Sequence, residues 1–287
     1  MKRVTAILSD YDGTLCPVAS LRTKSDRIPE ELEKVLQIIS GIIPICIISS
    51  KDFPFLHNRV RFASQLSCVF GIETIVHNSR RDMHHGDSLD CIMSRRLVVN
   101  RQSLSETSKL LRSVSTNILQ SYEDVRIEEK YTSDKEILIG LTIDYRHLEN
   151  WQSFKEDKES MIREAIQSTI NANMKPDLSF QDRAFLQTYS SHPFLELYGA
   201  QCDKGLAFDN ILLGLGEKES ANVMYLGDSE NDNPAFRKSH IPIGIKSDTR
   251  VNPSLDCDYM LNFNQLSLFL RGLLNNDFIF SEVLLPR

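Results

Sequence analysis

The chain has 287 residues, of which 41% are hydrophobic and 25% are charged, and its formal net charge is −6. This length exceeds one typical domain, so we expect one large domain or two smaller ones. The acidic balance excludes an overall positive field that would attract nucleic acid or an anionic membrane surface.

The first seventy-odd residues alternate between predicted strands and helices. Residues 4–9 form a short apolar strand, and a helix follows from Pro29 with apolar residues at helical spacing. The next strand, IIPICIISS at 42–50, is apolar on both faces, as in a parallel sheet. Shorter strands are predicted at 68–70 and 74–77. This alternation is typical of a doubly wound α/β sheet.

The middle of the chain has a different character. A polar stretch, HNSRRDMHHGDSLD at 77–90, reads as a linker, and its His84 and His85 are expected to be solvated rather than metal ligands. The elements predicted after it are strands at 97–100, 125–128, 137–144, 185–189 and 194–198, and helices at 105–120 and 154–170. Together they predict a compact α+β unit.

Alternation of helix and strand resumes at Lys204. The elements predicted there are helices at 204–213, from Asn231 and at 266–273, and strands at 223–228 and 241–245. The simplest account is a doubly wound parallel sheet domain formed by residues 1–79 and 200–287, with an α+β domain inserted at 80–199.

Several features favour a cytoplasmic protein. The six cysteines are scattered without a CxxC pair, which is typical of buried thiols in a reducing compartment. The N-terminus lacks the apolar segment of a signal peptide. The most apolar stretch, from Val35 to Ser50, is interrupted by polar residues, glycine and proline, which argues against a membrane span.

Acidic and hydroxyl side chains follow three of the predicted strands. Asp10 and Asp12 come after the first strand, Ser49 after the apolar run IPICII at 43–48, and Asp228 and Asp232 after the apolar run VMYL at 223–226. The carboxyl ends of parallel strands share one edge of a sheet, so these groups should meet there. Acids brought together in this way repel one another unless a divalent cation lies between them, and oxygen ligands suit Mg²⁺.

Four segments together resemble a known family. The sequence DYDGT at 10–14, the serine at 49, DKG at 203–205 and GDSENDNPAF at 227–236 resemble, in order, the four signature motifs of the haloacid dehalogenase-like (HAD) hydrolases. The inserted α+β region resembles the cap domain of the Cof, sucrose-phosphatase and trehalose-6-phosphate-phosphatase branch. The resemblance therefore implies a HAD-type core with a cap.

The resemblance also implies roles for individual residues. Asp10 would be the nucleophile, Asp12 the general acid and base, and Lys204 a cation that offsets charge on the reacting groups. The implied phosphate-binding residues are Gly13, Thr14, Ser49, Ser50 and Asn231. The implied Mg²⁺ ligands are Asp10, Asp12 through its backbone carbonyl, Asp228 and Asp232.

Two parts of this assignment stay open. The second motif usually reads Ser or Thr, Gly, Arg in this branch, whereas here Ser49 and Ser50 precede Lys51, so either serine can face the phosphate. In the inserted domain, Arg183 and His192 lie near predicted strands, where their side chains can contact the leaving group of the substrate. An ordinary sheet surface is the alternative reading for both.

The resulting prediction is a Mg²⁺-dependent phosphatase that hydrolyses a small phosphorylated metabolite through an aspartyl-phosphate. The resemblance favours a sugar phosphate of the trehalose-6-phosphate, sucrose-phosphate or mannosyl-phosphoglycerate type, because an inserted cap admits small substrates and excludes bulk water. The alternatives are a hexose phosphomutase of the mannomutase type, a phosphoglycolate phosphatase, and a non-enzymatic phospho-acceptor or metabolite-binding module. No nucleic-acid or membrane partner is expected, and the sequence leaves the oligomeric state open.

Overall fold

The computed structural model describes residues 2–17, 27–77, 92–173, 184–190, 192–246 and 254–285. The chain divides into two compact units. The first comprises Met1–Lys51, Phe55–Arg96 and Asp203–Arg287, and the second comprises Asp52–Pro54 and Leu97–Cys202. The predicted start of the inserted domain at residue 80, with His84 and His85, lies outside the described residues.

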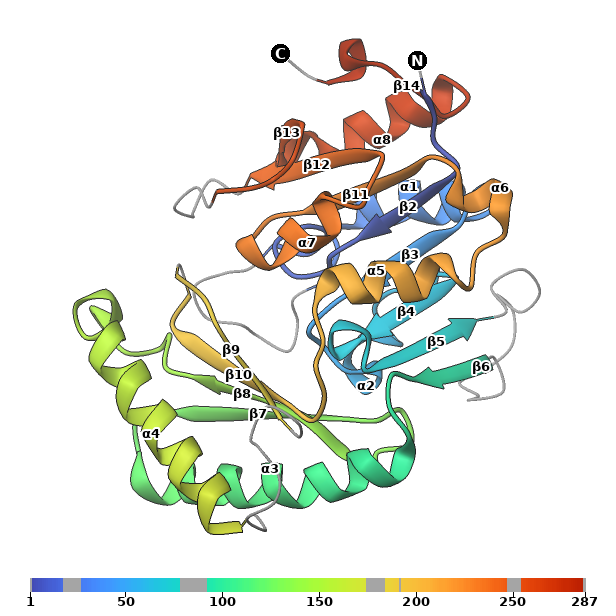
Figure 1. The fold of residues 1–287 in the computed structure, drawn as a ribbon. Coiled ribbons are helices and arrows are strands. Elements are labelled where there is room, and N and C mark those ends of the chain that lie inside the picture. Colours follow the sequence, from blue (N-terminus) through green and yellow to red (C-terminus); the bar gives the residue numbers. More distant parts are fainter. Residues whose placement is uncertain are drawn as a thin grey trace. The chain divides into compact units, whose positions relative to one another are not determined.

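An eight-stranded sheet forms the centre of the first unit (Figure 1). Its strands, in spatial order, are β13 (Tyr259–Asn262), β12 (Ile241–Lys246), β11 (Val223–Gly227), β2 (Ala6–Ser9), β3 (Ile45–Ile48), β4 (Gln65–Cys68), β5 (Glu73–His77) and β6 (Ile92–Leu97). Every neighbouring pair from β13 to β4 is parallel. Strands β2, β3 and β11 are buried along their whole length, as expected of strands covered on both faces.

Helices cover both faces of this sheet, as Figure 1 shows with α5 in front of it and α1 behind. Helix α1 (Glu30–Ser40) packs against α8 (Leu266–Asn275), and α5 (Lys204–Leu212) packs against α7 (Asn233–Phe236). Side chains of α5 and α7 share one apolar core with β2, β3 and β11. The predicted α/β class and doubly wound sheet are therefore confirmed.

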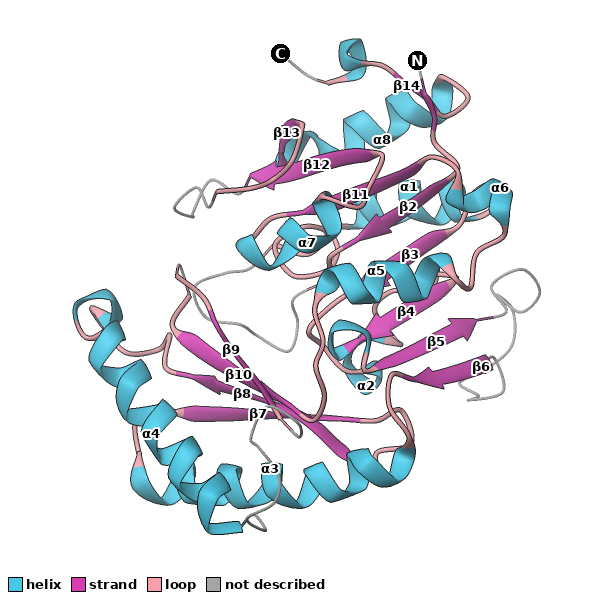
Figure 2. Ribbon diagram, in the orientation of Figure 1, coloured by secondary structure: helices cyan, strands magenta, loops and turns pink. Residues whose placement is uncertain are grey.

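The second unit is an antiparallel sheet with two long helices on one face (Figure 2). Its strand order is β7 (Arg126–Tyr131), β8 (Leu138–Asp144), β10 (Phe194–Tyr198) and β9 (Phe185–Thr188). Helices α3 (Arg101–Ser121) and α4 (Lys155–Asn173) bury their apolar faces against β8 and β10. None of the helices in the described part of the chain is both long and apolar enough to cross a membrane.

The remaining elements are short. They are β1 (Lys2–Arg3), which pairs with β14 (Ile279–Phe280), the helices α2 (Phe53–Leu56) and α6 (Glu217–Ser220), and the 3₁₀ turns Val69–Gly71, Trp151–Ser153, Glu230–Asp232, Phe263–Gln265 and Glu282–Leu284.

Two predicted strands differ from the structure. The strand predicted at 68–70 ends at Cys68, because Val69–Gly71 forms a tight turn that lets β5 return antiparallel to β4. The sheet is therefore mixed at this edge rather than parallel throughout. The strand predicted at 97–100 is also wrong: β6 ends at Leu97, and the Asn100 side chain caps α3 by accepting a bond from the backbone nitrogen of Ser103 at 2.8 Å.

Candidate active site

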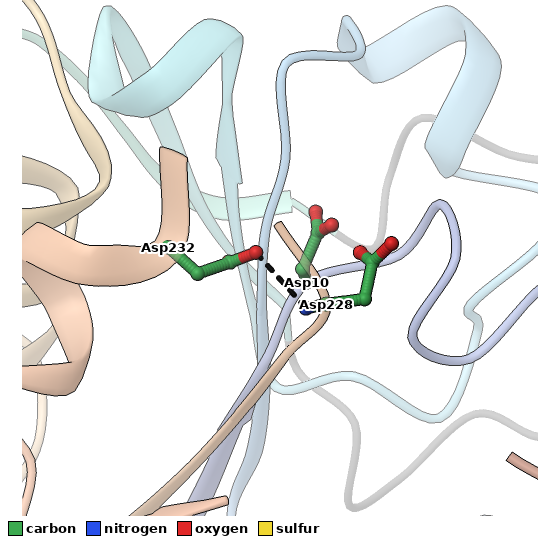
Figure 3. Close-up of side chains that lie close together, drawn as sticks. All are labelled: Asp10, Asp228 and Asp232. Carbon is green, nitrogen blue, oxygen red and sulfur yellow. Dashed lines mark hydrogen bonds between the residues drawn. The ribbon is translucent and has the colours of Figure 1, made fainter. Parts of the chain in front are cut away.

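Two neighbouring strands place the first two acids of the candidate site. Asp10 follows β2 and Asp228 follows β11, and the Asp10 backbone nitrogen donates to the carbonyl of Leu226 at 2.9 Å. With Asp232 they form a group in which each residue offers one carboxylate oxygen, and these oxygens lie within 4.8 Å of one another (Figure 3). All three side chains are buried. The sheet therefore brings together acids that lie more than two hundred residues apart in the chain.

The carboxylate of Asp232 is saturated with hydrogen bonds. Its Oδ1 accepts from Lys204 Nζ at 2.7 Å and from the Tyr225 hydroxyl at 2.6 Å. Its Oδ2 accepts from the backbone nitrogens of Asp228 at 3.1 Å and Ser229 at 3.0 Å. Figure 3 marks the bond to Asp228. A carboxylate has about four lone-pair sites, so Asp232 holds the loop in place and leaves Asp10 and Asp228 as the better cation ligands.

Lys204 connects two of these acids. It is the first residue of α5, whose N-cap Asp203 accepts a bond from the Leu206 backbone nitrogen at 2.7 Å. The Lys204 ammonium lies 3.1 Å from Asp10 Oδ2 and 2.7 Å from Asp232 Oδ1, and the side chain is only 1% exposed. The helix start therefore fixes the cation that the third motif predicts beside the nucleophile.

The Gly13–Thr14 pair contacts Asp228. Gly13 has φ +88°, and a Cβ at this position would lie 2.1 Å from Asp228 Oδ2, so only glycine fits there. The Thr14 hydroxyl donates to Asp228 Oδ1 at 3.1 Å. Both residues are predicted to serve the phosphate, and the structure shows that they also position an acid of the cluster.

Asp12 lies in the turn that follows Asp10. The turn is closed by bonds from the Leu15 and Cys16 nitrogens to the Tyr11 carbonyl, at 3.0 and 2.9 Å, and Asp12 is half-buried. Its carboxylate is not one of the three that converge. The role predicted for Asp12 in binding a metal involves its backbone carbonyl, and its role in proton transfer stays a prediction.

The hydroxyl residues predicted to bind phosphate differ in exposure. Ser49 is buried, and its Oγ accepts from the Lys51 backbone nitrogen at 3.1 Å, whereas Ser50 is half-buried. Asn231 is half-buried, and its Oδ1 accepts from Ser229 Oγ at 2.9 Å, which ties it to the loop after β11. Their roles in binding phosphate stay predictions.

Burial and charge shift the pKa values in this cluster. Burial raises the pKa of Asp10 well above its usual range; Lys204 opposes this shift, and the carboxylates of Asp232, Asp228 and Asp12 add to it. Burial alone would lower the pKa of Lys204, but the carboxylates of Asp10 and Asp232 outweigh it and raise that pKa. The lysine therefore remains charged, while burial and the neighbouring carboxylates destabilise the ionised form of Asp10.

These observations test whether a divalent cation fits. Three buried carboxylates face one ammonium, so with every acid ionised the cluster carries a formal charge of −2. The surrounding donors are all oxygen atoms, which suits a hard cation such as Mg²⁺. Burial is the main cause of the raised pKa of Asp10, and the neighbouring carboxylates add to it. Both the charge and the chemistry of the donors therefore fit the predicted metal.

The residues predicted for substrate contact lie in the second unit. Arg183 falls outside the described residues. His192 is half-buried, and its ring stacks on Phe194 with centroids 5.1 Å apart and meets Tyr189 edge-on at 5.7 Å. His192 therefore belongs to an aromatic cluster, and a role in reading the leaving group stays a prediction.

Sequence reasoning missed two buried polar features. Tyr225 lies within the apolar strand β11, where nothing in the pattern indicates that its hydroxyl reaches Asp232. In the second unit, Lys130 Nζ lies 2.6 Å from Glu196 Oε1, and both side chains are buried. Glu196 lies within the strand predicted at 194–198, but Lys130 lies just beyond the strand predicted at 125–128, so the sequence pattern did not indicate this ion pair.

The comparisons with known proteins concern the fold. No family model matches the chain, and no curated protein matches its sequence. Among solved structures, the C-terminal domain of C. albicans trehalose-6-phosphate phosphatase matches with a TM-score of 0.66 and 16% identity, covering 95% of this chain and 92% of that chain. A HAD subclass IIB sugar phosphatase matches with a TM-score of 0.55 and 13% identity, covering 96% and 100%.

A third match is a HAD phosphatase from Bacteroides thetaiotaomicron, with a TM-score of 0.55, 12% identity and 96% of each chain covered. At these identities the structural similarity is evidence for the fold alone. It covers 95% or more of this chain and so spans both units. The chain therefore has the fold of the capped haloacid dehalogenase-like phosphatases.

Proposed function

We propose that this chain is a Mg²⁺-dependent phosphatase that hydrolyses a small phosphorylated metabolite, most simply a sugar phosphate, with Asp10 as the nucleophile. One observation carries the proposal: the Asp10 carboxylate lies 3.1 Å from Lys204 Nζ and within 4.8 Å of the Asp228 carboxylate, at the carboxyl ends of two central strands. Ligands of open α/β sheets bind at this edge. An aspartate with a fixed cation and a second acid suits phosphoryl transfer.

The chain's own residues account for both halves of the reaction. An Asp10 oxygen attacks phosphorus while the bond to the leaving oxygen breaks, and Asp12 gives that oxygen a proton. Asp12 then takes a proton from a water molecule, whose oxygen attacks phosphorus while the bond to Asp10 breaks. Phosphate leaves and both carboxylates return to their starting states.

Two features of the site support these steps. Lys204 carries a fixed positive charge beside Asp10, where negative charge must be offset as the phosphoryl group arrives. Asp10, Asp228 and the backbone carbonyl of Asp12 would hold Mg²⁺, and Asp232 would orient the loop. When bound, Mg²⁺ supplies positive charge that neutralises the acids and aligns the phosphate.

The substrate class rests on similarity rather than on a pocket. Structures that share the fold include a trehalose-6-phosphate phosphatase and a sugar phosphatase, at 16% and 13% identity. The sequence DYDGTL at 10–15 is similar to that of trehalose-6-phosphate phosphatases, whereas GDSENDNPAF is closer to mannosyl-phosphoglycerate, phosphoglycolate and sucrose-phosphate phosphatases. A sugar phosphate is therefore the substrate class with most support.

Release of phosphate from a panel of sugar phosphates, with and without Mg²⁺, tests the proposal. We expect Mg²⁺-dependent release by the wild type and none by Asp10→Asn. Asp209→Asn is the matched control, because Asp209 lies on the surface and pairs with Lys238. Equal activity of Asp10→Asn and wild type would reject Asp10 as the nucleophile. Formation of a hexose phosphate isomer instead of free phosphate would favour a mutase.

A further inference from the structure

A turn with unusual backbone geometry lies beside the candidate site. The three successive residues Val69, Phe70 and Gly71 have φ values of +49°, +51° and +91°. Glycine adopts such angles freely, but a β-branched valine and a bulky phenylalanine do so only at a cost. Strained backbone of this kind persists only where surrounding contacts impose it, and it gathers at functional sites.

Backbone hydrogen bonds hold this turn to the second motif. The Val69 nitrogen donates to the Lys51 carbonyl at 3.0 Å, and the Phe70 nitrogen donates to the Ser49 carbonyl at 3.0 Å. The turn is therefore hydrogen-bonded to the segment that carries the predicted phosphate-binding serines.

The other side of the turn packs against helix α5. Gly71 lies so close that a Cβ added there would be 3.0 Å from the Ala207 Cα. Phe70 is buried, and the centre of its ring lies 5.7 Å from the Lys204 ammonium. The turn therefore links the second motif to the start of α5 and presents an aromatic ring to the site's lysine.

We propose that Phe70 is a positioning residue that holds the Lys204 ammonium toward Asp10, and that the left-handed turn at 69–71 serves to aim its ring. An ammonium within about 6 Å of a ring centroid is attracted by the electrons of the ring. The inference rests on the proposed function, because Lys204 must stabilise charge on Asp10 for its position to affect the rate.

The contacts around Lys204 explain why a ring suits this place. Its ammonium already donates to Asp232 and lies beside Asp10, and the side chain is almost completely buried. A polar group at residue 70 would compete with these acids for the ammonium protons, whereas a ring attracts the charge without accepting a strong hydrogen bond. Phe70 therefore leaves the ammonium directed at the acids.

Graded fluorination of the ring tests this role without changing its packing much. Phenylalanines carrying one, two or three fluorine atoms are placed at residue 70, since each fluorine weakens the attraction of the ring for a cation. We expect kcat to fall stepwise to about one fifth, with KM unchanged, since a loss of about 1 kcal/mol corresponds to that factor. The same kcat for all the fluorinated variants and the wild type would overturn the proposal.

The same fluorinated residues at Phe269 are the matched control. Phe269 is as buried as Phe70 but lies on α8, among apolar neighbours and Phe280. We expect its fluorination to leave kcat unchanged. A fall as large as that at residue 70 would mean that fluorination acts through packing alone, and would also overturn the proposal.

A double-mutant cycle on unfolding tests the contact in the metal-free protein, independently of activity. Phe70→Leu should lower the folding equilibrium constant about fivefold more in the wild type than in the Lys204→Met background, because only the wild type has the ammonium to lose. Equal effects in both backgrounds would refute the contact. If the wild-type protein proved inactive, the proposed function would be rejected. The double-mutant cycle would still show whether the Phe70 ring attracts the Lys204 ammonium.

Discussion

Lys204 in the first unit and Lys130 in the second are both buried, but their electrostatic surroundings differ. In the first unit, Lys204 lies between Asp10 and Asp232, with Asp228 in the same cluster. In the second unit, Lys130 faces the single carboxylate of Glu196. That carboxylate also accepts bonds from Thr142 at 3.0 Å and Tyr189 at 2.7 Å. The first cluster has excess negative charge, and the second is neutral.

The pKa values of the two carboxylates record this difference. Burial raises the pKa of Asp10, and neighbouring acids add to the shift despite Lys204. Burial also pushes the pKa of Glu196 upward, but Lys130 and the surrounding hydroxyl groups outweigh it, so that pKa lies below its usual value. We therefore assign the unbalanced cluster around Lys204 to the candidate active site and the balanced pair Lys130–Glu196 to a structural role.

Removal of Lys130 should produce the largest loss of stability. Lys130→Met leaves Glu196 buried without a cation, which costs about 3–5 kcal/mol of unfolding free energy. Urea unfolding followed by circular dichroism measures it. The double variant Lys130→Met/Glu196→Leu should recover most of the loss, because a neutral apolar pair has no charge to compensate. A single variant as stable as the wild type would contradict a structural role for the pair.

Removal of Lys204 should lower kcat. Lys204→Met takes away the cation beside Asp10, and loss of one such electrostatic contact costs about 10²–10³ in kcat. Steady-state phosphate release, with KM determined separately, measures it. The surface variant Lys238→Met is the control, since Lys238 pairs with exposed Asp209. A kcat equal to that of the wild type would show that the charge imbalance has no catalytic use.

Tyr225→Phe should have a smaller effect on the same cluster. It deletes the hydroxyl that donates to Asp232 Oδ1 at 2.6 Å but keeps the ring. A hydrogen bond to a charged group contributes about 1.5–3 kcal/mol, so we expect a loss of stability in that range and a modest loss of kcat. Thermal unfolding and phosphate release measure the two effects. Unchanged stability would contradict a contribution of the hydrogen bond from Tyr225 to Asp232 to the stability of the fold.

The smallest expected effect is a change in the pH dependence of stability. Because the pKa of Glu196 is lower in the folded protein than in the unfolded chain, its ionised form adds stability above the ordinary glutamate pKa. That stability is lost as the pH falls through the folded-state pKa. The stability gap between wild type and Glu196→Gln should therefore narrow toward acid pH. A gap that stays constant would contradict the ion pair.

The sequence predicted the parts of the site that lie in short motifs. Asp10 and Asp228 each follow a recognisable apolar strand, so topology predicts that they meet, whereas the place of Lys204 beside them was implied by the resemblance to the family. The same logic predicted the alternation of strands and helices in the first unit. Local spacing and strand order were sufficient because the carboxyl ends of parallel strands share one edge.

Contacts that depend on backbone angles could not be predicted. The run CVF at 68–70 is apolar and reads as a strand, yet Val69 and Phe70 adopt left-handed angles that their residue types disfavour. The hydrogen bond of Tyr225 and the ion pair of Lys130 likewise depend on distances across strands. Such features follow from tertiary packing, which overrides local preference.

The effect of Mg²⁺ on thermal unfolding tests the central claim most directly. In the wild type, Mg²⁺ should raise the melting temperature, because it binds the folded acid cluster and the unfolded chain offers no such site. Asp228→Asn should lose most of that increase, and surface Asp209→Asn should keep it. No increase in the wild type, or an equal increase in Asp228→Asn, would contradict a cation site formed by the acids of β2 and β11.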